Sequence, residues 1–234
     1  MTSRILTVKD EDNCEDVIQE AVRTIREGGL VVYPTDTSYG IACDPMQEQA
    51  LDRLISVKNR DKGIGVPLLF TDIHQCEAYH DFGSLERVLA RLFWPGALTL
   101  IVTTKDTIPA YITGGRGSAA IRVPNHFLPR RIAKELGIPI VGSSANLSGG
   151  ETPFEVSVAF EQLGDGVDLY IDGGPSSASA NSTIVGVEGA GTDAPLNIKV
   201  YREGSLSVDR ITESLRIDSD ALRFWTNRII YPDM

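Results

Sequence analysis

Positively charged side chains cluster in one short segment of this sequence. Lys58, Arg60 and Lys62 place three cations within five residues. Lysine provides a compact charge and arginine a planar fork of donors, so this spacing suits the binding of a polyphosphate. The same residues could instead stabilise the carboxyl end of a helix through its dipole. Spacing alone leaves both interpretations open.

Another cation, Arg122, lies in the otherwise apolar stretch 119–123. A half-buried arginine usually needs an anionic partner. That partner is either an aspartate of the fold or the carboxylate of a substrate, and both possibilities stay open here. Just upstream, glycines surround Arg116 in segment 113–118, where exposed backbone amides could also bind an anion.

Two further segments offer hydroxyl and amide groups. Residues 34–40 (PTDTSYG) could hold a small polar ligand or could simply cap a helix. Residues 142–146 (GSSAN) look like a nucleophile elbow, but Asn146 stands where the G-x-S-x-G motif requires glycine, and no histidine follows Ser144. We therefore expect Ser144 and Asn146 to hydrogen-bond a ligand rather than to form a serine hydrolase site.

The chain is long enough for one large domain and too acidic for a general nucleic-acid coat protein. Its 234 residues include 22 Lys and Arg against 32 Asp and Glu, a net charge of −10. Non-specific phosphate binding needs clustered cations, so any RNA contact would require a local basic patch. The three cysteines form no CxxC pair, the N-terminus has no apolar signal-peptide core, and no apolar stretch is long enough to span a membrane. We expect a cytoplasmic protein without a disulfide framework or a structural zinc site.

Helical and extended patterns alternate along the chain, which predicts an α/β fold with a mixed sheet and flanking helices. The helical patterns cover residues 17–25, 50–58, 85–92, 128–136 and 156–163. The extended patterns cover residues 30–33, 67–70, 97–103, 119–123, 138–141, 167–171, 183–187 and 197–201. Polar, glycine-rich stretches follow several strand ends, where such folds build their sites.

The end of the chain differs from the rest. From residue 207 onward a weak helical pattern carries too little apolar mass for a second core. We therefore expect one domain over residues 1–206 and a tail over residues 207–234 that forms no separate domain.

Several segments together resemble a known family. They are GGLVVYPTDTSYGIACDP, KNR, FWPGALTLIV, SAAIRVPNH, GIPIVGSSANLSG, DGG, NSTIV and YREG. Each is weak alone, but as an ordered set over roughly residues 15–206 they resemble the YrdC/Sua5 family of threonylcarbamoyl-AMP synthases. The chain is similar to the short form, because it ends too soon for an added C-terminal Sua5 domain.

The resemblance implies a fold, a reaction and partners. The fold would be a twisted open α/β sheet, YrdC-like, with a concave basic face. The reaction would convert L-threonine, bicarbonate and ATP into threonylcarbamoyl-AMP and pyrophosphate. A partner transferase would then move the threonylcarbamoyl group to adenosine 37 of tRNA. Magnesium would arrive with ATP, held by its phosphates, and the protein itself would hold no metal.

The resemblance also implies roles for particular residues. Lys58 and Arg60, from the family's KxR motif, would be catalytic. The threonine-binding residues would be Thr35, Arg122, Ser144 and Ser182. The ATP-binding residues would be Lys58, Arg60, Lys62, Ser118, Asn146 and Arg202. Both reactants are anions, so cations are needed to bring the carbamate oxygen of threonine to the α-phosphorus of ATP.

A different function class would use the same basic face. The sequence departs from the commonest family pattern at Ser38, at Thr71 and in a longer segment 58–67. These departures keep open a module that binds double-stranded or structured RNA without synthase activity, as in the YciO-like branch. Pyrophosphate release that needs threonine and bicarbonate together would favour the synthase. Salt-sensitive RNA binding without ATP turnover would favour the RNA-binding module.

Overall fold

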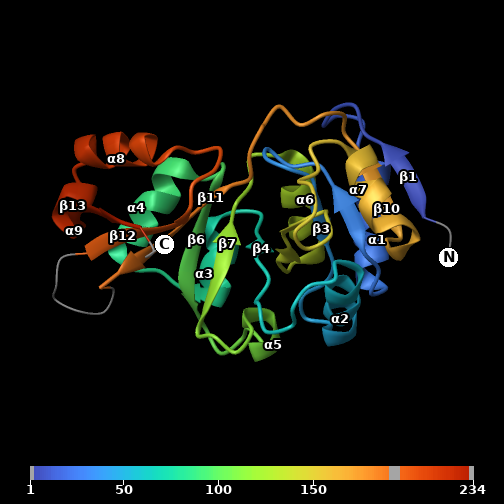
Figure 1. Cartoon of the computed structure of the whole chain (residues 1–234), viewed down its shortest axis with the longest axis horizontal. Coiled ribbons are helices and arrows are strands. Elements are labelled where there is room, and N and C mark those ends of the chain that lie inside the picture. The colour runs from blue at the N-terminus through green and yellow to red at the C-terminus, as the bar shows by residue number, and fades with distance from the viewer. Residues whose placement is uncertain (1–2, 190–195, 232–234) are drawn as a thin grey trace.

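The alternating patterns of the sequence form an α/β structure with two mixed sheets (Figure 1). This computed structural model describes residues 3–189 and 196–231. The α/β class, the mixed strand directions and the flanking helices are confirmed, but the strands form two sheets where one was expected. Strands β3 (Gly40–Ala42) and β9 (Ser143–Ser144) pair with each other in the smaller sheet. Strands this short give no period-two pattern in the sequence, so the smaller sheet was not recognised as separate.

The smaller sheet has five strands in the order β1-β10-β2-β3-β9. The three strands not yet given are β1 (Arg4–Thr7), β10 (Leu169–Asp172) and β2 (Val31–Tyr33). These three run parallel, whereas β3 is antiparallel to both β2 and β9. The connection between β2 and β3 therefore returns the chain beside itself and holds residues 34–39 at one end of this sheet.

The larger sheet has eight strands, with seven in the order β13-β12-β11-β6-β7-β4-β8 and β5 paired to β6. The strands are β4 (Leu68–Leu69), β5 (His80–Asp81), β6 (Leu98–Thr104), β7 (Ser118–Arg122), β8 (Ile140–Val141), β11 (Thr183–Glu188), β12 (Leu196–Arg202) and β13 (Trp225–Ile230). The predicted strands are thus confirmed, with bounds shifted by a few residues.

The predicted helices are confirmed, and short ones join them. The helices are α1 (Glu15–Arg26), α2 (Glu48–Val57), α3 (Ile73–Tyr79), α4 (Ser84–Phe93), α5 (Ala110–Thr113), α6 (Phe127–Leu136), α7 (Val156–Leu163), η1 (Gly164–Gly166), α8 (Val208–Ile217) and α9 (Ala221–Phe224). Glycine ends α6 as expected, because Gly137 adopts φ 74°, a left-handed conformation that other residues rarely take. None of these described helices is long and apolar enough to cross a bilayer.

Helices α1 and α7 cover opposite faces of the smaller sheet, whereas one face of the larger sheet has little helical cover. Seen from behind, α1, α6 and α4 lie in front of the strands, whereas Figure 1 leaves β6, β7 and β11 open to the viewer. Helices α1 and α6 pack together with strands of the smaller sheet around Ile18, Ile25 and Leu128. The uncovered face of the larger sheet is consequently available to form a site.

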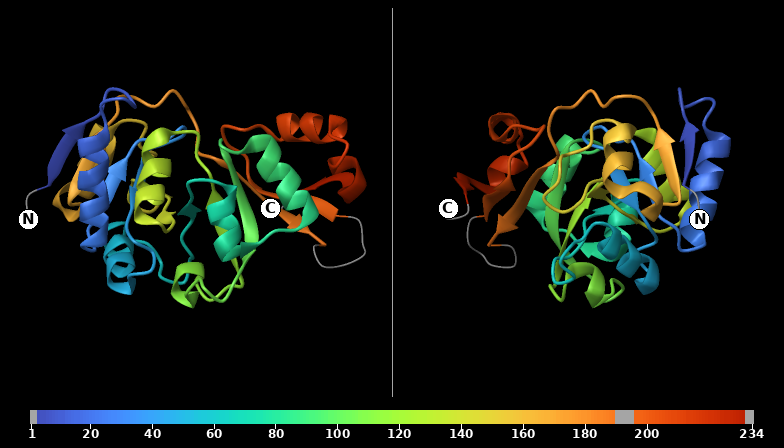
Figure 2. Two further views of the ribbon diagram at one scale, coloured as in Figure 1. Left: turned by 180° about the vertical axis from the view of Figure 1, so that it is seen from behind. Right: turned by 45° about the vertical axis from the view of Figure 1, so that its right-hand side comes forward.

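The segment after residue 206 folds onto the larger sheet. Strand β13 pairs in parallel with β12, and α8 and α9 lie at the end of the molecule away from β1 (Figure 2). Ile211, Leu215 and Trp225 are buried within the main hydrophobic core rather than in a core of their own.

Candidate functional site

A cavity of about 620 Å³ opens where the two sheets meet. The smaller sheet and its loops contribute tyrosine, threonine and serine side chains and the backbone of Gly40. The larger sheet and its loops contribute arginines together with further hydroxyl and aliphatic groups. The polar residues around the cavity are Thr35, Thr37, Ser38, Arg60, Thr99, Thr113, Arg116, Ser118, Arg122, Ser143, Ser144, Asn181, Ser182 and Arg202.

Strand geometry explains how the larger sheet lines this cavity. Side chains two residues apart on a strand point to the same face. Ser118, Ala120 and Arg122 of β7 lie on the cavity side, as do Thr99 and Ile101 of β6. One strand therefore presents a hydroxyl group and a guanidinium group to the same space.

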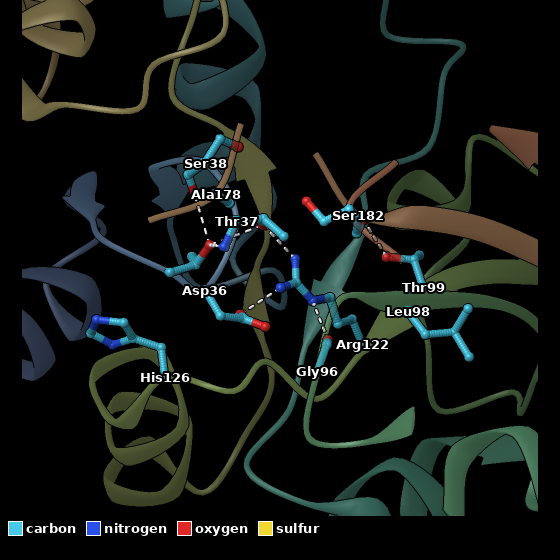
Figure 3. Close-up of polar contacts among 12 residues, drawn as sticks. Asp36, Thr37, Ser38, Gly96, Leu98, Thr99, Arg122, His126, Ala178 and Ser182 are labelled. Carbon is cyan, nitrogen blue, oxygen red and sulfur yellow. Dashed lines mark hydrogen bonds and ion pairs between the residues drawn. The ribbon is translucent and has the colours of Figure 1, made fainter. Parts of the chain in front are cut away.

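All three guanidinium nitrogens of Arg122 donate hydrogen bonds within the protein. Arg122 is 6% exposed, and its Nη2 lies 2.5 Å from Asp36 Oδ1 (Figure 3). Its Nη1 donates to Thr37 Oγ1 at 2.8 Å, and its Nε donates to the Gly96 carbonyl at 2.8 Å. Of the two partners that the sequence left open, an aspartate of the fold is therefore present. A guanidinium has five N–H groups, so two remain for a ligand.

Three more arginines surround the cavity. Arg60 Nη2 donates to the Gly65 carbonyl at 2.8 Å, whereas its buried Nε has no hydrogen-bond partner among the described residues. Arg202 donates to the Ser182 carbonyl from Nε and Nη2, at 3.1 and 2.9 Å. Burial lowers the pKa of Arg60, and burial followed by the charge of Arg122 lowers the pKa of Arg202. An anion in the cavity would offset both costs.

The hydroxyl groups form short networks beside these cations. Thr35 Oγ1 donates to the Ser38 carbonyl at 2.7 Å and accepts from the Thr37 amide at 2.9 Å, which fixes the turn between β2 and β3. Ser182 Oγ lies 2.8 Å from Thr99 Oγ1. Small polar side chains held in this way can orient the hydroxyl and amino groups of a ligand.

Three predicted site residues lie outside the cavity lining. Lys58 is 2% exposed at the end of α2, and its Nζ donates to the Ser144 carbonyl and, at 2.6 Å, to the Asn146 carbonyl. Asn146 Nδ2 donates to the Leu147 and Gly150 carbonyls at 2.9 and 3.0 Å. Lys62 pairs with Asp52 at 2.8 Å. Burial, followed by the charge of Arg60, lowers the pKa of Lys58 to about 8.

The structure thus separates the predicted residues into two groups. The cavity is lined by Thr35, Arg60, Ser118, Arg122, Ser144, Ser182 and Arg202. Lys58 instead holds the backbone at Ser144 and Asn146, the Asn146 side chain holds the loop up to Gly150, and Lys62 lies on the outside. The backbone of Lys58 ends α2, but its ammonium group contacts the Ser144 and Asn146 carbonyls, whereas Arg60 lines the cavity.

Sequence reasoning missed several residues of the site. Thr99 on β6, Tyr201 on β12 and Asn181 line the cavity without having been assigned a role. Thr37 and Ser38 also line it, and they belong to segment 34–40, which was considered for ligand binding. A threonine among the leucines of a central strand is a usable signal, because a polar side chain there needs a buried partner. Tyr201 offered no signal, since an aromatic residue in a strand is ordinary.

The arrangement resembles no metal centre. Within residues 3–189 and 196–231, no three His, Cys, Asp or Glu side chains are grouped so that they could hold a metal ion. Cys14, Cys43 and Cys76 are buried free thiols. The cavity can offer an anionic ligand guanidinium groups, hydroxyl groups and backbone amides.

Comparisons with known proteins point to one family. The Sua5/YciO/YrdC family model, described as telomere recombination, matches residues 23–204. A threonylcarbamoyl-AMP synthase of Idiomarina loihiensis is 32% identical over 79% of this chain and 96% of its own length. Pyrococcus abyssi Sua5 complexed with L-threonine matches with TM-score 0.84 and 27% identity over 97% of this chain, which spans 62% of that protein. Escherichia coli YciO matches with TM-score 0.76 and 25% identity over 87% of this chain and 96% of its own.

Proposed function

This chain belongs to the Sua5/YciO/YrdC family, and we propose that it makes threonylcarbamoyl-AMP and pyrophosphate from L-threonine, bicarbonate and ATP. The names of its relatives support this proposal, since the Idiomarina loihiensis relative is a threonylcarbamoyl-AMP synthase. The observation that carries it is a single cavity that places Arg122, Arg60 and Arg202 around one space beside several hydroxyl groups. The product would serve a partner transferase that modifies tRNA in the cytoplasm.

Threonine would bind at the meeting of β7 with the β2–β3 turn. The two free N–H groups of Arg122 would hold its carboxylate as a charge-assisted pair. Ser144 and Ser182 line the same space and would bind the hydroxyl and amino groups, while Thr35 shapes the turn. A site that hydrogen-bonds a hydroxyl rejects valine far better than shape alone does. The Pyrococcus abyssi relative, solved with L-threonine, supports the choice of amino acid.

The triphosphate would lie against the remaining cations. Arg60 has a buried Nε without a partner among the described residues, which a phosphate oxygen would satisfy. Arg116, Ser118 and Arg202 surround the same cavity. Lys58 would act from behind by fixing the backbone at Ser144 and Asn146, because its Nζ donates to both carbonyls. The Asn146 side chain would fix the loop that follows, because its Nδ2 donates to the Leu147 and Gly150 carbonyls.

Magnesium would enter with ATP. No carboxylate is among the side chains that line the cavity in the described part of the chain. The donor set therefore fits an ion held through the phosphates rather than by the protein, and that ion would neutralise phosphate charge. The residues named above would still bind and orient both substrates.

The chemistry needs two anions to meet. Threonine's amine and bicarbonate give a carbamate with loss of water, and a carbamate oxygen then attacks the α-phosphorus while pyrophosphate leaves. Guanidinium groups on the larger-sheet side of the cavity would reduce the repulsion, and the walls would hold the reacting atoms close. Positioning and charge would thus supply most of the rate acceleration.

One incubation tests the proposal. The protein is mixed with threonine, bicarbonate, ATP and Mg²⁺, and threonylcarbamoyl-AMP is sought by mass spectrometry alongside pyrophosphate release. Product that depends on all three substrates is expected. Salt-sensitive binding of structured RNA with no pyrophosphate release under these conditions would overturn the synthase and favour the RNA-binding alternative.

A further inference from the structure

Arg122 is held by groups that are not substrate. Asp36, Thr37 and Gly96 each accept one of its hydrogen bonds, at 2.5, 2.8 and 2.8 Å. The first two belong to the β2–β3 turn of the smaller sheet, and Arg122 ends β7 of the larger sheet. The ion pair between Asp36 and Arg122 consequently ties the two sheets together at the cavity.

Asp36 contacts Arg122 from outside the cavity. Its neighbours Thr35, Thr37 and Ser38 line the cavity, but Asp36 does not, and its side chain is 15% exposed. Figure 3 places Asp36 and Gly96 on one side of the guanidinium and Ser182 on the other. Ser182 lines the cavity and Asp36 does not, so Asp36 contacts the guanidinium without itself facing the space where a ligand would bind.

We propose that Asp36 is a positioning residue, which orients the Arg122 guanidinium so that its two unused N–H groups grip the carboxylate of the amino-acid substrate. This inference rests on the proposed threonine site. A long arginine side chain is mobile unless other groups hold it, and a guanidinium fixed beforehand loses less entropy when a carboxylate binds. Asp36 also supplies the negative charge that lets an almost fully buried guanidinium remain in place without substrate.

Competition between Asp36 and the substrate for Arg122 would change threonine affinity in the opposite direction. If Asp36 instead competed with the substrate for Arg122, removing its charge would tighten threonine binding. Because Asp36 lies outside the cavity lining, and because two N–H groups of Arg122 remain for a ligand, substrate need not displace it. We therefore expect weaker threonine binding when Asp36 is replaced.

The test compares Asp36→Ala with Asp36→Asn in the full chain. Loss of a hydrogen bond to a charged group predicts that Asp36→Ala raises the KM for threonine about tenfold or more. The KM for ATP should stay within twofold of wild type. Asp36→Asn keeps an oxygen acceptor at nearly the same size, so it should fold and show an intermediate effect. Discrimination between threonine and threonine amide should shrink in both variants.

A matched ion pair elsewhere provides the control. Arg53 Nη1 lies 2.7 Å from Asp168 Oδ2, and this pair joins α2 to the edge of β10, outside the cavity. Asp168→Asn should lower the thermal unfolding midpoint without changing the KM for threonine. A purely structural role for Asp36 would give this same result.

Calorimetric titration of threonine separates the outcomes. Wild type that binds threonine but makes no product would refute the proposed synthesis while still allowing Asp36 to be tested by affinity. Unchanged threonine affinity in folded Asp36→Asn and Asp36→Ala would overturn the positioning role, and tighter binding would establish competition instead. If wild type does not bind threonine, the threonine site and this inference fail together.

Discussion

The two walls of the cavity are built from different chemistry. The smaller sheet contributes Thr37, Ser38 and Ser144 to the lining, and none of its described lining residues carries a charge. The larger sheet and the loops beside it contribute every arginine of the described lining: Arg60, Arg116, Arg122 and Arg202. One wall can recognise hydroxyl and amino groups, and the other can neutralise anions.

The two walls differ in how closely their side chains can be packed. An uncharged wall can be packed closely, and Thr35, Thr37 and Ser38 are at most 7% exposed. Guanidinium groups resist complete burial and need partners, so they come from strand ends and from the loops around Arg60 and Arg116. Where the walls meet, Asp36 of the uncharged side provides the one carboxylate that Arg122 contacts among the described residues. The predictions on site residues below test this division of labour.

The largest effect is expected on the cationic wall at Arg60. Arg60→Ala should remove about 2–4 kcal/mol of transition-state stabilisation, by analogy with loss of one oxyanion donor. The physical reason is that the positive guanidinium group of Arg60 would neutralise negative charge on the triphosphate. The measurement is kcat/KM for ATP in the pyrophosphate-release assay. Wild-type turnover in this variant would remove Arg60 from the ATP site.

Arg122→Ala should act on the other substrate. Losing its charged hydrogen bonds should cost about 1.5–3 kcal/mol of threonine binding, with the KM for ATP much less affected. The measurement is threonine affinity by calorimetry beside steady-state KM values. Equal losses for both substrates would mean that the cationic wall is not divided between carboxylate and phosphates.

The larger sheet also carries a buried group that should make the protein sensitive to acid. His80 on β5 is 1% exposed beside Phe70, and burial lowers its pKa from 6.5 to about 4. Between these values the unfolded chain binds a proton that the folded protein does not. Stability from this group is therefore complete above about pH 6.5 and declines as the pH falls toward 4, by about 2 kcal/mol at pH 5.

Urea unfolding at pH 7.5 and pH 5 measures this loss. His80→Leu should remove the contribution of His80 to the pH dependence, whereas His74→Gln, at a side chain that is 87% exposed, should retain it. An unchanged pH dependence in His80→Leu would show that protonation of another group destabilises the protein in acid.

The sequence predicted the main elements because their signals are long. The apolar spacing of α1 and the strand patterns of β6 and β11 cover six residues or more and appear at nearly the expected positions. Strands β3, β5 and β9 were missed because three residues or fewer carry no periodicity, and β1 and β13 were missed as well. Without them the second sheet could not be predicted.

The site was predictable by residue type more than by geometry. Arg122 was notable because an arginine in an apolar strand needs a partner, and the partner is Asp36. Lys58 matched the same charge pattern as Arg60, yet its side chain points to backbone carbonyls instead of the cavity. Spacing along a chain cannot reveal that direction, because it depends on how the loop leaves α2.

A smaller effect is expected on the uncharged wall. Ser144 lies on β9 opposite Gly40 and lines the cavity. Ser144→Ala should lower kcat/KM for threonine by about 0.5–1.5 kcal/mol, the typical value of a neutral hydrogen bond. Ser157→Ala on the exposed side of α7 is the control and should leave kcat/KM unchanged. A loss as large as that of Arg122→Ala would mean that the two walls contribute equally.

The smallest effect is expected at Lys62, two residues beyond Arg60. The family resemblance assigns both residues to ATP, but Lys62 pairs with Asp52 at 2.8 Å, with side chains 68% and 51% exposed. Exposed pairs contribute little, so Lys62→Ala should change stability by less than about 0.5 kcal/mol and leave the KM for ATP within twofold. Measuring that KM beside Arg60→Ala compares two cations of one segment. An equal loss of ATP binding in both variants would show that Lys62 reaches the phosphates when ATP binds. The cationic wall would then extend beyond the lining described above.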